Sequence, residues 1–439
     1  MGTRISPLIV VIVLFVSAAA HPMQHAGAKR MMRQGDALDR KKNASPGLRR
    51  CKASSLMWVR RYITVDEKAG RALYYYFAEA PDAASRPLLC GSTAVISLLS
   101  PSLSLSDDQR LLFSYSGPAV PRSAMEHGGA RALPRDERWK TLFRNPYAWN
   151  NGTGECAVLG EPAGVGFSYS NTTADYQMSG DSRINWLGRF AEYKTRDFYI
   201  AGESYAGIAI GNAVINDLTD EKGITRDHQR NCDFTFSGGT DGDACQAALA
   251  EASAVFYDVD IYNIYGPLCF DGNLTRVPKT TSIYDFDPCS DYYVQSYLND
   301  PAVQEALHAN VTRLDYPWSA CSSDLPAWLD STSTVLPLLQ EFMANGWRVW
   351  VYSGDTDGRV PVTSSRYSVD ALELPVKAPW RPWSAVDEVG GYSITYKGDL
   401  TLATVRGAGH EVPSFQAQRS LVLIQAFLEG KPLPDYIVE

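Results

Sequence analysis

The feature that most constrains the fold of this chain is an apolar run followed by a sharp turn at residues 198–207. Residues 198–201 suit a buried strand, and Gly202-Glu203-Ser204-Tyr205-Ala206 follows at once. This is the G-x-S-x-G arrangement of a nucleophile elbow, with Ala206 in place of the last glycine. Only small residues fit two places either side of the serine in so strained a turn. The pattern predicts a reactive Ser204 at a sheet edge, although small-residue loops without function share it.

Length and composition are those of an ordinary globular enzyme. The 439 residues allow one large core with an insertion, or two domains, and 45% of them are hydrophobic and 21% charged. The net charge of -8 argues against nucleic acid as the main partner. The 8 cysteines include no CxxC motif or Cys/His cluster, so we expect no metal site and no cofactor.

The first 20 residues have the pattern of a secretory signal peptide. Arg4 supplies the charge, residues 7–16 the apolar core and residues 17–20 the small-residue cleavage site. The apolar run is too short for a membrane span, and no later stretch qualifies. We therefore expect a protein of the secretory pathway, extracellular or vacuolar and without membrane attachment after signal removal. Residues 21–56 are basic and polar, which predicts a flexible leader.

Cysteines and glycosylation sequons fit the same compartment. In an oxidising environment most of the cysteines should pair. Residues 219–290 hold four of them in polar, loop-rich sequence, which indicates an insertion stapled by disulfides. The Asn-x-Ser/Thr sequons, which also arise by chance, begin at Asn43, Asn151, Asn171, Asn273 and Asn310.

Alternation and turn residues predict several elements. A hairpin is expected at 62–65 and 72–77, around the turn sequence 66–70. Asp300 and Pro301 begin a helix as N-cap and first residue. No firm element is expected in residues 88–145, which are low in complexity and then rich in Pro, Arg and Gly. The last third alternates strand and helix, with strands at 348–352, 392–396 and 400–405 and a helix at 414–428.

Two loops complete a candidate catalytic group. Ser353-Gly354-Asp355-Thr356-Asp357-Gly358 and Gly407-Ala408-Gly409-His410 each follow a predicted strand, as Ser204 does. In a mostly parallel sheet the strand C-termini share one edge. The order Ser204, Asp357, His410 is that of α/β-hydrolases. His410 would take the serine proton, and Asp357 would fix the histidine tautomer. Asp355 is a rival to Asp357, and spacing alone does not choose between them.

Three segments resemble the signatures of the serine carboxypeptidase family. They are residues 198–207, 352–361 and 406–413, and the similarity to plant two-chain members is close from about Asp285 onward. The resemblance implies an α/β-hydrolase fold over residues 57–439, with a mostly parallel central sheet, flanking helices and an insertion at about 219–290. It implies a hydrolase that releases C-terminal residues from peptides or proteins without a cofactor, and it leaves a homodimer open.

The resemblance also implies roles for single residues. The triad would be Ser204, Asp357 and His410, with the Tyr205 amide in the oxyanion hole. Glu203 would help to bind the C-terminal carboxylate of the substrate, because a carboxyl beside a carboxylate has a raised pKa and can donate a hydrogen bond. The implied disulfides are Cys232–Cys245 and Cys269–Cys289, with an excised linker between the latter two cysteines.

Two segments depart from the family pattern. The Asn-Gly-Gly-Pro-Gly-Cys-Ser-Ser loop, which supplies a second oxyanion amide, is missing after Leu89. Its absence leaves Cys321 with Cys51, Cys90 or Cys156 as partner. The predicted strand 208–215 also follows Ser204 too soon for a crossover helix, which needs roughly a dozen residues. Two alternatives stay open: an acyltransferase of the same family that uses glucose esters, and a catalytically impaired or inactive member.

Overall fold

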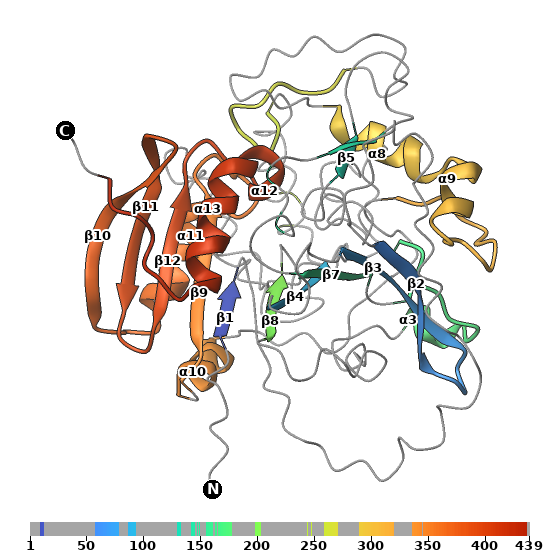
Figure 1. The fold of residues 1–439 in the computed structure, drawn as a ribbon, viewed down its shortest axis with the longest axis horizontal. Coiled ribbons are helices and arrows are strands. Elements are labelled where there is room, and N and C mark those ends of the chain that lie inside the picture. The colour runs from blue at the N-terminus through green and yellow to red at the C-terminus, as the bar shows by residue number, and fades with distance from the viewer. Residues whose placement is uncertain are drawn as a thin grey trace, which may run out of the picture.

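We describe a computed structural model of the chain (Figure 1). Among the described residues, no helix is long and apolar enough to cross a membrane. The structure describes residues 9–12, 58–78, 87–93, 130–132, 142–144, 147, 149, 155–160, 163–164, 166–177, 198–202, 244, 247, 259–270, 289–319, 336–344 and 346–436.

Four strands of the C-terminal third and one strand from the N-terminal end, β1, form a five-stranded sheet in the order β1-β9-β12-β11-β10. The strand β9 lies between two parallel neighbours, β1 and β12, which explains its nearly continuous burial. The hairpin predicted at 392–396 and 400–405 is confirmed as β11 and β12. The strands are β1 (Ile9–Ile12), β9 (Arg348–Gly354), β10 (Val376–Ala385), β11 (Glu388–Tyr396) and β12 (Leu400–Val405).

The strand β10 was not predicted from the sequence. It contains Pro379 and Pro382, and proline cannot donate to a sheet ladder. The strand is tolerated because it is the last strand of the sheet: it pairs with β11, with several register shifts, and makes a single isolated bridge, from Trp383 to Asp435. It also carries Trp383, which is fully buried and donates its indole N–H to the Thr404 carbonyl at 3.0 Å.

Helices flank this sheet and complete the main core. The helix α13 buries Leu423, Ile424 and Phe427, and the Phe427 ring meets Trp350 of β9 edge to face at 5.5 Å. The predicted C-terminal helix at 414–428 is confirmed in part, since it is interrupted at Gln416 and forms two helices. The helices are α10 (Leu336–Ala344), α11 (Val362–Asp370), α12 (Val412–Phe415) and α13 (Ala417–Leu428).

A second five-stranded sheet has the order β2-β3-β7-β4-β8. The predicted hairpin is confirmed as β2 and β3, with the turn at 67–70. The expectation of no firm element in 88–145 was wrong, because β4, β5 and β6 form there. The apolar start of β4 pairs in parallel with β7 and β8, and this tertiary pairing outweighs the weak local signal. The strands are β2 (Trp58–Asp66), β3 (Arg71–Ala78), β4 (Leu88–Thr93), β7 (Glu155–Gly160) and β8 (Phe198–Gly202), with β5 (Ala130–Ala132) and β6 (Leu142–Arg144) in a separate pair.

The two sheets meet where β1 lies beside β8, and Figure 1 shows their arrows pointing the same way. The central strands β7, β4, β8, β1, β9 and β12 are thus parallel, with antiparallel strands at both outer edges. Residues 9–12 of β1 belong to the predicted signal peptide, whose removal stays a prediction. Residues 208–215, predicted as a strand, lie outside the described residues.

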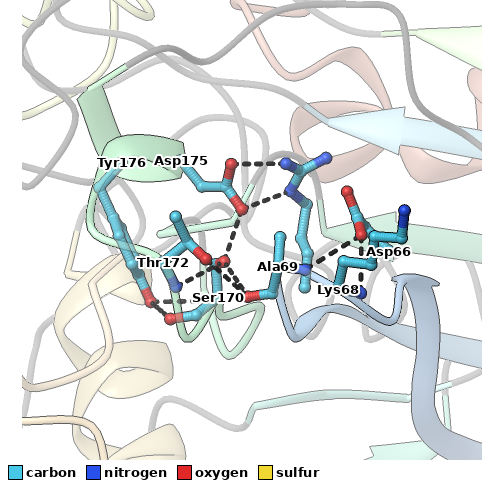
Figure 2. A network of polar contacts seen from close by, with 8 residues as sticks. Asp66, Lys68, Ala69, Ser170, Thr172, Asp175 and Tyr176 are labelled. Carbon is cyan, nitrogen blue, oxygen red and sulfur yellow. Dashed lines mark hydrogen bonds and ion pairs between the residues drawn. The ribbon is translucent and has the colours of Figure 1, made fainter.

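The turn of the β2–β3 hairpin is held by what we call the hairpin cluster: Asp66, Arg71, Ser170 and Asp175. Figure 2 labels Asp66, Ser170 and Asp175. Asp66 Oδ1 accepts hydrogen bonds from the backbone N–H groups of Lys68 and Ala69 at 3.0 and 3.1 Å. Buried Arg71 donates through Nε and Nη2 to both Asp175 oxygens, at 2.9 and 2.5 Å. Asp175 is in α3 (Ala174–Gln177), so the cluster ties the hairpin to residues 170–177.

A disulfide joins Cys269 to Cys289, as the resemblance implies. Cys289 is the N-cap of α8 (Ser290–Leu298), which is followed by α9 (Pro301–Ala306). The predicted start of α9 is confirmed, because the Asp300 side chain accepts from Ala302 N at 2.8 Å and Pro301 is the first helical residue. The bond therefore anchors one end of residues 259–270 to a helix pair.

Candidate active site

Two loops leave the same edge of the C-terminal sheet side by side. In the parallel pair β9 and β12, Gly354 lies opposite Val405, so the two strands end level with each other. Backbone pairing continues into the loops: Asp355 N donates to Val405 O at 3.2 Å, and Thr356 N donates to Ala408 O at 3.0 Å. Parallel pairing of two buried strands is thus the reason that Asp357 and His410, 53 residues apart, meet.

The side chains of Asp357 and His410 form a buried pair. His410 Nδ1 lies 2.8 Å from Asp357 Oδ2, and the two side chains are 3% and 5% exposed. The other carboxylate oxygen accepts from the backbone N–H groups of Arg359 and Val360, at 2.7 and 2.9 Å. A carboxylate on Nδ1 keeps the proton on that nitrogen, which leaves the lone pair on Nε2. The pair has the geometry of a general base with its orienting acid.

Asp355, the sequence-level rival of Asp357, has a different role. Its Oδ1 accepts from the backbone N–H of Gly407 at 2.6 Å, so it braces the base of the histidine loop. Burial raises the pKa of Asp355 above its ordinary value, and the Gly407 hydrogen bond opposes this only in part. The two aspartates lie two positions apart, and only their tertiary contacts distinguish them.

A third segment, residues 259–266, packs on both loops and was not predicted as part of the site. Ile261 O accepts from Gly358 N at 3.0 Å, and Ile264 N donates to Thr356 O at 2.9 Å. His410 N donates to Tyr262 O at 2.7 Å. The sequence places the segment inside the expected disulfide-stapled insertion, and nothing in its residue types points to His410.

Asp260 begins this third segment beside the pair. Its Oδ1 accepts from Tyr262 N at 2.9 Å. Burial and the nearby negative charge of Asp357 raise the pKa of Asp260 to about 6, against the lowering effect of backbone hydrogen bonds and of His410. Perturbed carboxyls cluster at functional sites, and this shift is the signal that identifies a residue which sequence patterns missed.

The other predicted site residues fall partly outside the described residues. Ser204, Glu203 and Tyr205 are outside, and so are Cys232 and Cys245. The strand β8 ends at Gly202, two positions before Ser204, and Gly202 is level with Ser92 of β4. The family's oxyanion loop, which this sequence lacks, would come after β4. The strand β4 itself is present and pairs in parallel with β8. Within the described part of the chain, no group of three or more His, Cys, Asp and Glu residues could hold a metal ion.

Two of the five sequon asparagines are described. Asn171 is exposed beside the hairpin turn. Asn310 is half-buried, its Nδ2 donates to Gln304 Oε1 at 2.9 Å, and its Oδ1 accepts from Leu314 N at 2.7 Å. Glycosylation at both stays a prediction, as it does for Asn43, Asn151 and Asn273, which lie outside the described residues.

Comparison with known proteins identifies the family to which this chain belongs. The sequence profile of the serine carboxypeptidases matches residues 122–222 and 210–430. The chain belongs to the serine carboxypeptidase family. Serine carboxypeptidase-like 40 of Arabidopsis thaliana is 46% identical over 424 residues, which cover 85% of this chain and 80% of that protein. Serine carboxypeptidase 24 of the same plant is 37% identical over 440 residues, covering 85% and 89%.

A solved structure gives the fold of this serine carboxypeptidase-family chain. Kex1(delta)p, a prohormone-processing carboxypeptidase from Saccharomyces cerevisiae, superposes with a TM-score of 0.62 over 88% of this chain and 94% of its own. At 17% identity this likeness concerns the fold alone. The chain has the α/β-hydrolase fold expected from the resemblance. The two profile matches overlap at 210–222, where the sequence lacks room for a crossover helix after Ser204.

Proposed function

We propose that this chain removes residues from the carboxyl ends of peptides or proteins through an acyl-enzyme on Ser204. The observation that carries the proposal is the buried 2.8 Å contact between His410 Nδ1 and Asp357 Oδ2, at the edge where the parallel strands end. Because β8 ends at Gly202, Ser204 follows a strand of the same parallel set. This is the arrangement that a serine nucleophile requires of its base.

The reaction follows from the arrangement of the three groups. Ser204 Oγ attacks the scissile carbonyl carbon while its proton passes to His410 Nε2. The carbon–nitrogen bond then breaks, and the departing amine takes that proton from the imidazolium, whose charge Asp357 stabilises. Water attacks the ester through the same histidine and regenerates the serine. The Tyr205 amide would stabilise the oxyanion, and Glu203 would hold the C-terminal carboxylate of the substrate.

The family membership supports the substrate class, peptide or protein C-termini, with no nucleic acid and no membrane as partner. We place the chain in the secretory pathway, extracellular or vacuolar, and expect residues 1–20, which include β1, to be removed from the mature protein. A homodimer is compatible with the proposal. No cofactor takes part in the mechanism.

Labelling of Ser204 tests the proposal directly. Purified chain is treated with an active-site organophosphate, and the modified peptide is located by mass spectrometry, with Ser204→Ala and His410→Ala as controls. We expect labelling of Ser204 in the native chain alone, and hydrolysis of an N-blocked dipeptide at its C-terminal bond. Failure to label identifies a non-catalytic family member. Labelling with turnover of an acyl-glucose and not of the dipeptide identifies an acyltransferase.

A further inference from the structure

The segment 259–266 contacts both of the loops that carry the Asp357–His410 pair, which we call the dyad. It makes backbone hydrogen bonds to Gly358, Thr356 and His410, at 3.0, 2.9 and 2.7 Å. Two of these residues flank Asp357 in sequence, and the third is the other member of the pair. A shift of this segment therefore moves the carboxylate loop and the imidazole together.

Glycines on the two loops permit this close approach. A Cβ atom at position 409 would lie 2.1 Å from the Tyr262 carbonyl oxygen, and one at position 358 would lie 2.7 Å from a methyl group of Ile264. The contact at position 409 is with the backbone and is not sterically allowed while the backbone stays in place, and the contact at position 358 requires the Ile264 side chain to move. The glycines beside Asp357 and His410 are thus explained by the third segment rather than by the pair itself.

The contact on His410 comes from Tyr262, and Asp260 holds Tyr262. The Tyr262 ring meets the imidazole edge to face, with centroids 5.3 Å apart and planes at 69°. Its carbonyl accepts from the His410 N–H at 2.7 Å. The Asp260 side chain accepts from Tyr262 N at 2.9 Å, and its carbonyl accepts from Asn263 N at 3.0 Å, which closes a tight turn.

We propose that Asp260 and Tyr262 position His410: the Asp260 carboxyl closes the turn that holds the Tyr262 carbonyl and ring against the imidazole. The inference rests on the proposed function, in which His410 is the general base. It makes Asp260 a positioning residue, since it acts through Tyr262 rather than on the substrate. A small displacement of a catalytic base can cost about 10²-fold in rate.

The charge of Asp260 adds a pH-dependent effect. Among the described residues, the titratable groups that act on it are Asp357 and His410. Above pH 6 an ionised Asp260 places a second negative charge, besides that of Asp357, near the imidazole. Asparagine at this position keeps the turn acceptor and removes the charge. Alanine removes both.

The experiment compares Asp260→Ala, Asp260→Asn and Asp66→Asn in the full chain. Asp66 closes the hairpin turn by the same kind of contact, away from the pair, and serves as the matched control. We expect Asp260→Ala to lower kcat about tenfold or more with KM nearly unchanged, and Asp260→Asn to recover most of kcat. The Asp66→Asn variant should keep both constants.

The nitrogen NMR signals of the His410 ring, assigned with His410→Ala, report on the surroundings of the imidazole independently of turnover. We expect Asp260→Ala to shift these signals, Asp260→Asn to restore most of the native signals, and Asp66→Asn to leave them unchanged, because only Asp260 closes the turn that holds Tyr262 against the imidazole. Unchanged His410 signals together with native kcat in Asp260→Ala overturn the inference. If the native chain fails to label at Ser204 while the signals shift in Asp260→Ala, the proposed function fails and the positioning contact stands.

Discussion

The hairpin cluster and the dyad cluster (Asp260, Tyr262, Asp357 and His410) are built alike and behave differently. Each joins an aspartate-closed turn to a carboxylate that contacts a nitrogen base, and this carboxylate is half-buried in Asp175 and buried in Asp357. In the hairpin cluster the partner is Arg71, which keeps its proton at any physiological pH. In the dyad cluster the partner is His410, and histidine is the side chain that most often transfers protons in enzymes. In the proposed function, this difference between the two partners separates a structural pair from a catalytic one.

The turn aspartates of the two clusters shift in opposite directions. Backbone hydrogen bonds, chiefly from Ala69, lower the pKa of Asp66. Burial, with the negative charge of Asp357 beside it, raises the pKa of Asp260 to about 6. The same local motif thus favours the ionised carboxyl in one place and the neutral carboxyl in the other. Environment rather than turn geometry decides the protonation state.

The largest effect on kcat is expected at the Asp357–His410 pair, where the proposed mechanism transfers a proton. Asp357→Asn should lower kcat by about 10⁴-fold, because asparagine on Nδ1 favours the wrong histidine tautomer. Stability should change little, since the Arg359 and Val360 amides keep an oxygen acceptor. Steady-state kinetics on a blocked dipeptide measure the loss. A kcat near that of the native chain would remove the proposed role of Asp357.

The corresponding change in the hairpin cluster should act on stability instead. Asp175→Ala leaves the Arg71 guanidinium buried without its carboxylate and should lower the free energy of unfolding by about 3–5 kcal/mol. Because the pair lies on the hairpin and not at the dyad edge, kcat per titrated active site should stay constant. Urea unfolding and active-site titration measure the two quantities. A fall in kcat without a fall in stability would contradict the contrast between the clusters.

The pH dependence of stability separates the two turn aspartates. The pKa of Asp260 is raised from about 4 in the unfolded chain. Its favourable contribution is therefore complete below pH 4 and is lost as the pH rises through about 6. The loss is at most about 3 kcal/mol, and less where solvent screens the carboxyl. Asp66, whose pKa is lowered, contributes in the opposite sense, above its unfolded pKa.

Unfolding free energies of native chain and Asp260→Asn at several pH values between 4 and 7 test this. The difference between the two proteins should grow as the pH rises, in favour of the asparagine variant. The Asp66→Asn variant should be less stable than the native chain by a nearly constant amount over the same interval, because the lowered pKa keeps the Asp66 carboxyl ionised throughout. A pH-independent difference for Asp260→Asn would mean that the carboxyl does not titrate in this window.

The smallest effect is expected in the hairpin turn itself. Gly70 has a φ of +66°, and a Cβ there would lie 2.4 Å from Asn171 Nδ2 and 2.8 Å from Asn171 Cβ. Gly70→Ala should lower the free energy of unfolding by about 1–2 kcal/mol without changing kcat. Gly346 has a φ of +75° and no atom within 4 Å of a Cβ, so Gly346→Ala is the matched control for the backbone term alone. Equal losses in thermal unfolding of both variants would show that Asn171 moves without cost.

Much of the fold and part of the candidate site could be predicted from local signals. Short stretches of sequence are enough to predict three features: the turn at 66–70, the Asp300 cap and the buried strand β9. All three are confirmed. Other elements could not be predicted, because they form only by pairing with strands that are distant in the sequence. The strand β4 begins with two leucines, and β10 contains two prolines. Both become strands only because they pair with neighbouring strands of their sheets.

The sequence by itself determined the three loops, their order along the chain and the family they imply. Spacing could not choose between Asp355 and Asp357, because both follow the same strand two positions apart. Tertiary structure made that choice by placing one carboxylate on His410 and the other on Gly407. It also brought Asp260 to the pair from a segment with no motif of its own. The physical reason is that electrostatic interactions and burial depend on distances in space, and neighbouring positions in the sequence do not determine these distances.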